Sequence, residues 1–191
     1  HQALCGIDTV HYYDIDAAAM DKFEANLSDQ GIALHRATSV AEAVAQADIV
    51  TTATAAKRHG QVIDEELLRP GMHFNAIGGD CDQKTEFDPG VLSHCKIVIE
   101  HLPQTQLEGE MQCGQGSVYA ELWELVQQKK PGRVDDNEIT LFDSVGVAIE
   151  DYATLRCVYQ LSNDHAVGSD VALIPPKGCD PKNLFSLMMP A

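Results

Sequence analysis

Short apolar runs of strand character alternate with helical stretches through the first half of the chain. Strand-like runs are expected at residues 9–13, 32–35, 48–52, 72–77 and 96–99, with helices at 16–27 and 40–47. Parallel strands need a crossover between them, and a helix usually supplies it. The alternation therefore predicts an α/β fold, a doubly wound and mostly parallel sheet flanked by helices.

The second half of the chain is expected to be mostly helical. Helices are predicted at 115–128 and from about Ser144 to Leu161, joined by the turn Lys130–Arg133. The apolar tail 184–189 follows a proline-rich stretch and is expected to dock on a domain surface. All 191 residues suit one compact domain with C-terminal helices and a tail.

Charge and hydropathy exclude several classes of partner. With 29 acidic and 13 basic residues, the formal net charge is −16, which opposes binding to nucleic acid or to anionic membranes. No run reaches the roughly 18 apolar residues of a membrane span, and residues 1–7 do not look like a signal segment. We expect a soluble, cytoplasmic protein.

Six cysteines are scattered singly along the chain, without a C-x-x-C pair. Reduced thiols fit this pattern better than a disulfide framework, and no metal site is predicted.

The stretch Asn75–Glu86 carries the strongest signal for a functional site. An apolar strand runs into Gly78 and Gly79 and then delivers Asp80. The carboxyl ends of strands are where open α/β sheets bind ligands, so the glycines could let backbone approach a ligand, or could merely turn the chain. Asp80 could be a general acid or base, if an apolar pocket raises its pKa toward the operating pH, or an ordinary turn residue.

Two further segments, one at Asp143 and one at Asp14, each allow two interpretations. Asp143 and Ser144 are expected to start a long helix, where free N–H groups could hold a polar ligand or the two side chains could simply cap the helix. Asp14, after the first strand, could accept the ribose hydroxyls of a dinucleotide, or Asp14 and Asp16 could cap a helix. No G-x-G-x-x-G phosphate loop occurs in the chain.

In order and spacing, the segments Ala47–Thr54, Arg69–Asp80 and Phe142–Gly146 resemble the ornithine cyclodeaminase/mu-crystallin family. The resemblance implies that residues 1–191 form an incomplete, Rossmann-like NAD-binding domain that lacks its first strand and Gly-rich loop. It also implies an N-terminal substrate-binding and oligomerisation domain that this chain does not contain, and a homo-oligomer. The segment Asp180–Phe185 looks like the tail of the bacterial ornithine cyclodeaminases.

The same resemblance assigns roles to individual residues. Asp80 would be the catalytic acid or base, and Val145 would border the substrate. Cofactor contacts would come from Asp14, Thr54, Ile77, Gly78, Gly79, Lys84 and Ser144. Asp14 has no adjacent arginine, which favours NAD over NADP because a carboxylate repels a 2′-phosphate. Glu100, His101 and Glu108 receive no chemical role.

The activity implied is the redox-neutral conversion of L-ornithine to L-proline and ammonia, in which NAD takes a hydride and later returns it. A small amino acid, with L-ornithine favoured, is the expected partner. An amino-acid dehydrogenase, a ketimine reductase and a non-catalytic binding remnant are the alternatives. The isolated chain is not expected to be active.

Overall fold

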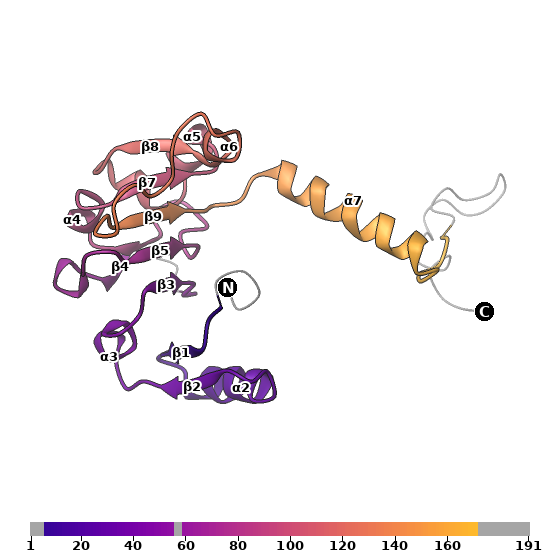
Figure 1. Cartoon of the computed structure of the whole chain (residues 1–191), viewed down its shortest axis with the longest axis horizontal. Coiled ribbons are helices and arrows are strands. Elements are labelled where there is room, and N and C mark those ends of the chain that lie inside the picture. Colours follow the sequence, from indigo (N-terminus) through magenta and orange to yellow (C-terminus); the bar gives the residue numbers. More distant parts are fainter. Residues whose placement is uncertain (1–5, 56–58, 172–191) are drawn as a thin grey trace. The chain divides into compact units, whose positions relative to one another are not determined.

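The computed structural model describes residues 6–55 and 59–171 (Figure 1). The chain divides into two compact units, residues 1–147 and 148–191. The strands described here belong to the first unit, and helix α7 (Ala148–Asp164) belongs to the second. The predictions for the docking tail and for the segment Asp180–Phe185 fall outside the described residues.

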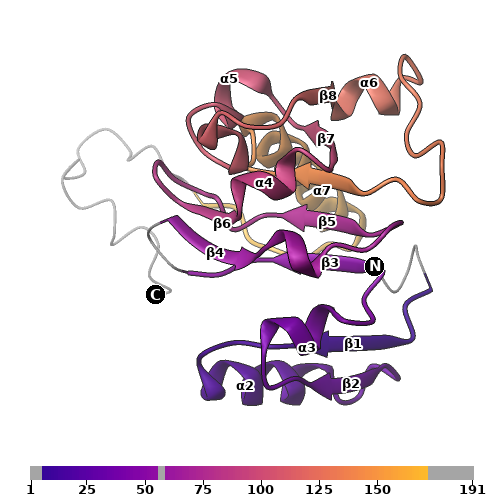
Figure 2. The ribbon, with the colours of Figure 1, turned by 90° about the vertical axis from the view of Figure 1, so that its left-hand side faces the viewer.

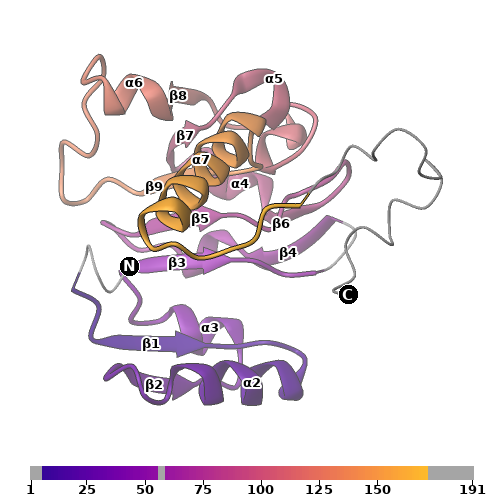
Figure 3. The same ribbon diagram turned by 90° about the vertical axis from the view of Figure 1, so that its right-hand side faces the viewer.

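The N-terminal part of the first unit is a small parallel α/β motif. Strand β1 (Thr9–Tyr12) leads through α2 (Ala17–Leu27) to β2 (Ala33–Arg36), which pairs with β1 in parallel, and α3 (Val40–Val44) follows (Figures 2 and 3). The Asp16 carboxylate caps α2 by accepting from the backbone N–H of Ala18. The Ser39 hydroxyl caps α3 by accepting from the N–H of Glu42, as serine and aspartate do at helix starts.

The main sheet has five strands, all paired in parallel. Their spatial order is β3 (Ile49–Thr52), β5 (His73–Ala76), β9 (Thr140–Asp143), β7 (Lys96–Ile99) and β8 (Val118–Glu121). Strands β4 (His59–Ile63) and β6 (Thr85–Phe87) form a separate parallel pair. The expected α/β fold with a mostly parallel sheet is confirmed.

Short helices and turns connect the strands. They are η1 (Glu65–Leu67), α4 (Pro89–Leu92), α5 (Leu102–Thr105), η2 (Glu110–Cys113) and α6 (Leu122–Val126). Proline at the first position of α4 lacks only an N–H that a helix leaves unpaired anyway, and Asp88 caps that helix by accepting from the N–H of Gly90.

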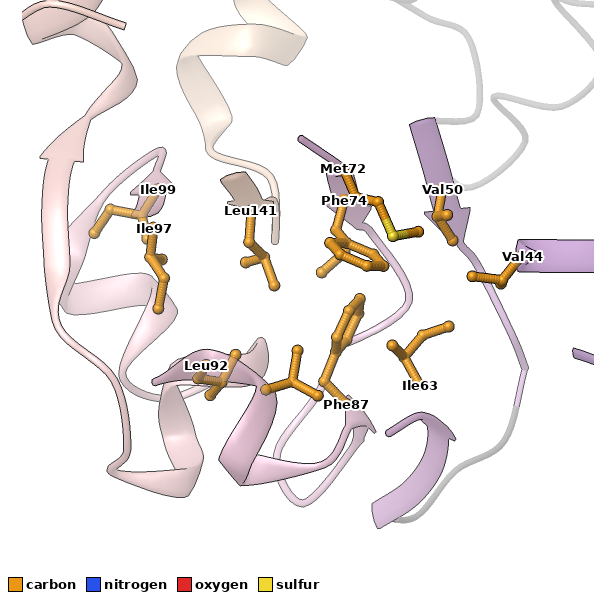
Figure 4. Close-up of a cluster of buried hydrophobic side chains, with 12 residues drawn as sticks. Val44, Val50, Ile63, Met72, Phe74, Phe87, Leu92, Ile97, Ile99 and Leu141 are labelled. Atoms are coloured by element: carbon orange, nitrogen blue, oxygen red, sulfur yellow. The ribbon is translucent and has the colours of Figure 1, made fainter. Parts of the chain in front are cut away.

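The core lies between one face of the five-stranded sheet and a layer formed by β4, β6 and α4 (Figure 4). Phe74 of β5 meets Phe87 of β6 edge to face, with ring centroids 5.5 Å apart. Leu141 of β9 and Ile97 of β7 continue this apolar layer, and all four side chains are fully buried. Removal of such side chains from water stabilises the sheet by about 1.5–3 kcal/mol each.

The predicted helix at residues 115–128 is wrong. Residues 118–121 form strand β8, and only Leu122–Val126 is helical. Gly114 and Gly116 have φ values of 68° and 78°, so the chain leaves helical geometry just before β8. Ala120 is buried in the sheet, which shows that pairing with β7 outweighs local helical propensity.

The start of the last helix was also predicted wrongly. Residues 140–143 form the central strand β9, and α7 begins only at Ala148. Strands β4 and β6 were not predicted either. No helix within residues 6–55 and 59–171 is both long and apolar enough to cross a membrane.

Candidate functional site

The register of the sheet brings most of the predicted site residues to one edge. Thr52, Ala76, Asp143 and Ile99 are successive partners across β3, β5, β9 and β7, and each is the last residue of its strand. The segments that follow these residues hold Thr54, Ile77–Asp80, Ser144–Val145 and Glu100. This edge is the carboxyl end of the sheet, where open α/β folds bind ligands.

Gly78 makes room for a protein carboxylate. The backbone N–H of Thr54 donates to Glu86 Oε1 over 2.6 Å, which holds the Glu86 side chain under the glycine. A Cβ atom at position 78 would collide with that carboxyl group. Glu86 is 1% exposed, and its second oxygen has no hydrogen-bond partner among the described residues.

Gly79 packs against a second glycine. The N–H of Gly109 donates to the carbonyl of Gly79 over 2.7 Å, and a Cβ at position 79 would lie 2.8 Å from the Gly109 Cα. A Cβ on Gly109 would in turn lie 2.6 Å from Val145 Cγ1. Gly79 and Gly109 therefore allow their two loops to pack closely. The sequence suggested two other reasons for Gly78 and Gly79, approach of the backbone to a ligand and a simple turn of the chain.

Asp80 and Lys84 form an ion pair, with 2.8 Å between Lys84 Nζ and Asp80 Oδ1. The Lys84 side chain is 5% exposed, whereas that of Asp80 is 68% exposed. The hydrogen bond from Lys84 lowers the pKa of Asp80 below its ordinary value. The role of general acid or base expected from the sequence requires an apolar pocket that raises the pKa of Asp80. The structure instead has an exposed Asp80 whose pKa is lowered. Asp80 is therefore an ionised carboxylate, suited to hold a cationic amine.

Ser144 and Val145 lie in the loop between β9 and α7. Ser144 Oγ donates to Glu100 Oε1 over 2.7 Å, and the N–H groups of Val145 and Gly146 donate to Glu100 Oε2 over 3.0 and 2.6 Å. The N–H of Ser144 donates to the carbonyl of Ala76. The expected helix N-terminus with free N–H groups is therefore wrong, as is helix capping by Asp143 or Ser144.

Sequence reasoning did not predict that three carboxyl groups lie buried beneath this edge. Asp143 accepts from the N–H groups of Glu110 and Met111, and Glu110 accepts from those of Glu86 and Phe87. Burial raises the pKa of Glu110 to about 8 and that of Asp143 to about 6, although the N–H donors partly oppose the rise. Together with Glu86, these groups tie the loops of the carboxyl edge to one another.

Two predicted cofactor residues differ in placement. Ile77 follows β5 directly and is 45% exposed, so it offers an apolar surface at the edge. Asp14 is exposed just after β1, which belongs to the two-stranded sheet β1–β2, and its carboxylate accepts from the N–H of Asp16. Asp14 thus makes a local turn contact, whereas the other predicted residues gather around β3, β5 and β9.

The five-stranded parallel sheet, with helices in its connections and the loops that hold these residues at its carboxyl edge, is an α/β domain of the Rossmann-like type. The model of the ornithine cyclodeaminase/mu-crystallin family matches residues 1–165, and the chain belongs to that family.

Known proteins agree with this assignment. The chain is 38% identical over 189 residues to ornithine cyclodeaminase of Agrobacterium tumefaciens, covering 98% of the chain and 53% of that protein. An archaeal alanine dehydrogenase dimer with bound NAD matches with a TM-score of 0.82 and 33% identity, over 91% of this chain and 55% of the other.

A third relative is Δ1-pyrroline-2-carboxylate reductase of Thermococcus litoralis in complex with NADH and L-proline. It matches with a TM-score of 0.79 and 32% identity, over 86% of this chain and 53% of the other. The chain thus spans about half the length of these relatives. The solved relatives hold NAD or NADH, in line with the cofactor expected from the sequence.

Proposed function

We propose that this chain is the NAD-binding part of an ornithine cyclodeaminase-type enzyme, which converts L-ornithine to L-proline and ammonia. One observation carries the proposal: Asp80, paired with Lys84, follows β5 at the carboxyl edge, and the last residue of β5, Ala76, accepts from the backbone N–H of Ser144. The 38% identity to an ornithine cyclodeaminase supports the choice of substrate.

The residues at the carboxyl edge fit the nicotinamide end of a dinucleotide. Ile77 offers an exposed apolar surface for a nicotinamide ring, and Ser144 offers a hydroxyl oxygen in the neighbouring loop. Thr54 and the backbone of Gly78 and Gly79 would border the rest of that end of the cofactor. Asp14 would hold the adenosine ribose. When bound, NAD would supply the hydride acceptor and donor of the reaction.

Asp80 would manage the amine protons of the substrate. Its lowered pKa keeps the carboxylate charged at neutral pH, so it can orient a cationic amine, although the same shift makes it a weaker acceptor for the amine proton. Lys84 would act through Asp80, because its buried ammonium group fixes one carboxylate oxygen and leaves the exposed oxygen for the substrate. Val145 would contribute an apolar wall.

The test is an assay of the full-length protein that contains this chain, with L-ornithine and substoichiometric NAD. Proline, ammonia and NADH are followed together. Proline and ammonia formed over many turnovers without net NADH are the expected result. Asp80→Asn should lower kcat by about 100-fold or more, the usual size of a general acid or base effect. Asp82→Asn, at an exposed carboxylate two residues away, is the matched control and should leave kcat nearly unchanged.

A second candidate is an amino-acid dehydrogenase or ketimine reductase, favoured by the similarity to alanine dehydrogenase and to Δ1-pyrroline-2-carboxylate reductase. Stoichiometric NADH with a 2-oxo acid product would establish the dehydrogenase, and NADH-dependent reduction of a cyclic imine would establish the reductase. A full-length protein that neither binds NAD nor turns over amino acids would be a non-catalytic relative.

A further inference from the structure

Glu100 makes an unusually complete set of contacts with the loop that follows β9. The residue comes directly after β7, which pairs with β9, so its side chain needs only to cross to the adjacent strand end. One carboxylate oxygen accepts from the Ser144 hydroxyl, and the other accepts from two consecutive backbone N–H groups. Hydrogen bonds to an ionised acceptor are stronger than neutral ones, so this clamp fixes the loop.

These contacts leave the loop without a hydrogen-bond donor at three consecutive positions. The N–H of Ser144 is used by the Ala76 carbonyl, and those of Val145 and Gly146 are used by Glu100. A serine hydroxyl has one hydrogen and two lone pairs, while a carboxylate only accepts. Because the hydrogen of Ser144 points to Glu100, the free lone pairs of its oxygen can only accept from a ligand.

We propose that Glu100 is a positioning residue that makes Ser144 a hydrogen-bond acceptor, so that this loop selects a ligand group carrying an N–H donor. This inference rests on the proposed function. If NAD binds at this edge, the matching group is the carboxamide –NH2 of the nicotinamide, and the carboxamide carbonyl finds no donor in residues 144–146.

The proposal is tested with two dinucleotides that differ only in this group. In 3-acetylpyridine adenine dinucleotide a methyl group replaces the –NH2 of NAD, while the carbonyl remains. Dissociation constants of the two oxidised dinucleotides are measured by titration calorimetry with the full-length protein. The protein should bind NAD about tenfold more tightly than the analogue, the fold-change expected for one hydrogen bond.

Variants locate the source of this preference. Ser144→Ala removes the acceptor, and Glu100→Gln replaces an acceptor-only group by an amide that can donate to the serine oxygen. Both should reduce the preference for NAD to about twofold or less. Glu108→Gln is the matched control, because Glu108 accepts from the side-chain amide of Gln104 instead of from this loop, and it should keep the tenfold preference.

The outcomes separate the two proposals. Equal affinity of the unmodified protein for both dinucleotides overturns this inference and leaves NAD binding intact. No binding of either dinucleotide overturns the proposed function and this inference with it. If Glu100→Gln does not fold, Glu100→Asp replaces it. That variant keeps the charge but withdraws the carboxylate by one methylene, so an unchanged preference in Glu100→Asp or in Ser144→Ala would also refute the proposal.

Discussion

At the scale of single residues, Glu86 shows how this chain keeps carboxylates in its interior. Within the described residues, the carboxyl groups of Glu86, Glu110 and Asp143 accept hydrogen bonds from backbone N–H groups, and the cationic Lys84 pairs instead with Asp80. Loops at the ends of parallel strands have N–H groups that no ladder uses, so acidic side chains can satisfy them. The acids thus join loops that are distant in sequence.

Gly78 is the residue most tightly constrained by this arrangement. Gly78→Ala should displace the Glu86 carboxylate and break its bond to Thr54, because the added Cβ would occupy the position of that carboxyl group. We expect a loss of about 1–3 kcal/mol in the free energy of unfolding, since a buried acceptor and a buried donor lose their partners. Weaker binding of NAD to the full-length protein should accompany it.

Chemical denaturation compares this variant with Gly132→Ala, where an added Cβ meets nothing within 4 Å. An equal effect of the two substitutions would show that Glu86 moves aside without cost.

At the scale of elements, the sequence predicts a strand correctly where the residues of that strand alone determine its conformation. Strand β7 lies at residues 96–99, as predicted, because an apolar run between polar residues marks a buried strand by itself. Strand β9 was missed because Thr140–Asp143 is short and runs into residues that look like a helix start. Its partners β5 and β7 are more than 40 residues away in the chain, and they decide its conformation.

Strand β9 should therefore be sensitive to changes in its buried side chain. Leu141→Ala removes a side chain that is 1% exposed and leaves a cavity between β5 and β7. We expect the free energy of unfolding to fall by about 2–5 kcal/mol. Leu107→Ala, the same substitution at a side chain 67% exposed, should cost little. Similar urea midpoints for the two variants would contradict a central position of β9 in the core.

At the scale of the whole molecule, the buried carboxyl groups make stability depend on pH. Burial raises the pKa of Glu110 from 4.5 to about 8, so the folded state holds its proton where the unfolded state has lost it. The contribution of protonated Glu110 to the free energy of unfolding is fully present below about pH 4.5 and is lost as the pH rises to about 8. Its upper limit is about 5 kcal/mol. The acidic excess, a net charge of −16, acts in the same direction.

Urea unfolding at pH 5, 6.5 and 8 measures this dependence. The free energy of unfolding should fall across the series, and Glu110→Gln should flatten the fall because glutamine does not titrate. Glu66→Gln, at an exposed side chain, should leave the slope unchanged. A slope that is equally steep in Glu110→Gln would exclude Glu110 as its source.

Whether the sequence predicts a site residue also depends on how far away in the chain its partners lie. Gly78 and Asp80 could be nominated because they follow an apolar strand, whereas Thr54 and Ser144 are nominated because their segments resemble the family. Glu100 could not be assigned a role, because its partners lie 44 to 46 positions further along the chain. The lowered pKa of Asp80 comes from its hydrogen bond with Lys84, a contact that the linear sequence does not reveal.

The position of β9 also has a consequence for how the chain folds. The strand at the centre of the five-stranded sheet is the last of the five to leave the ribosome, after β3, β5, β7 and β8. Until residue 143 has been synthesised, the pairs β3–β5 and β7–β8 have no strand between them. The edges of β5 and β7 that face β9 therefore remain unpaired. Parallel sheets whose strand pairs are distant in sequence fold slowly, and during folding their unpaired strand edges are prone to aggregation. Nascent chains of this protein are therefore expected to expose the inner edges of β5 and β7 until β9 has been synthesised.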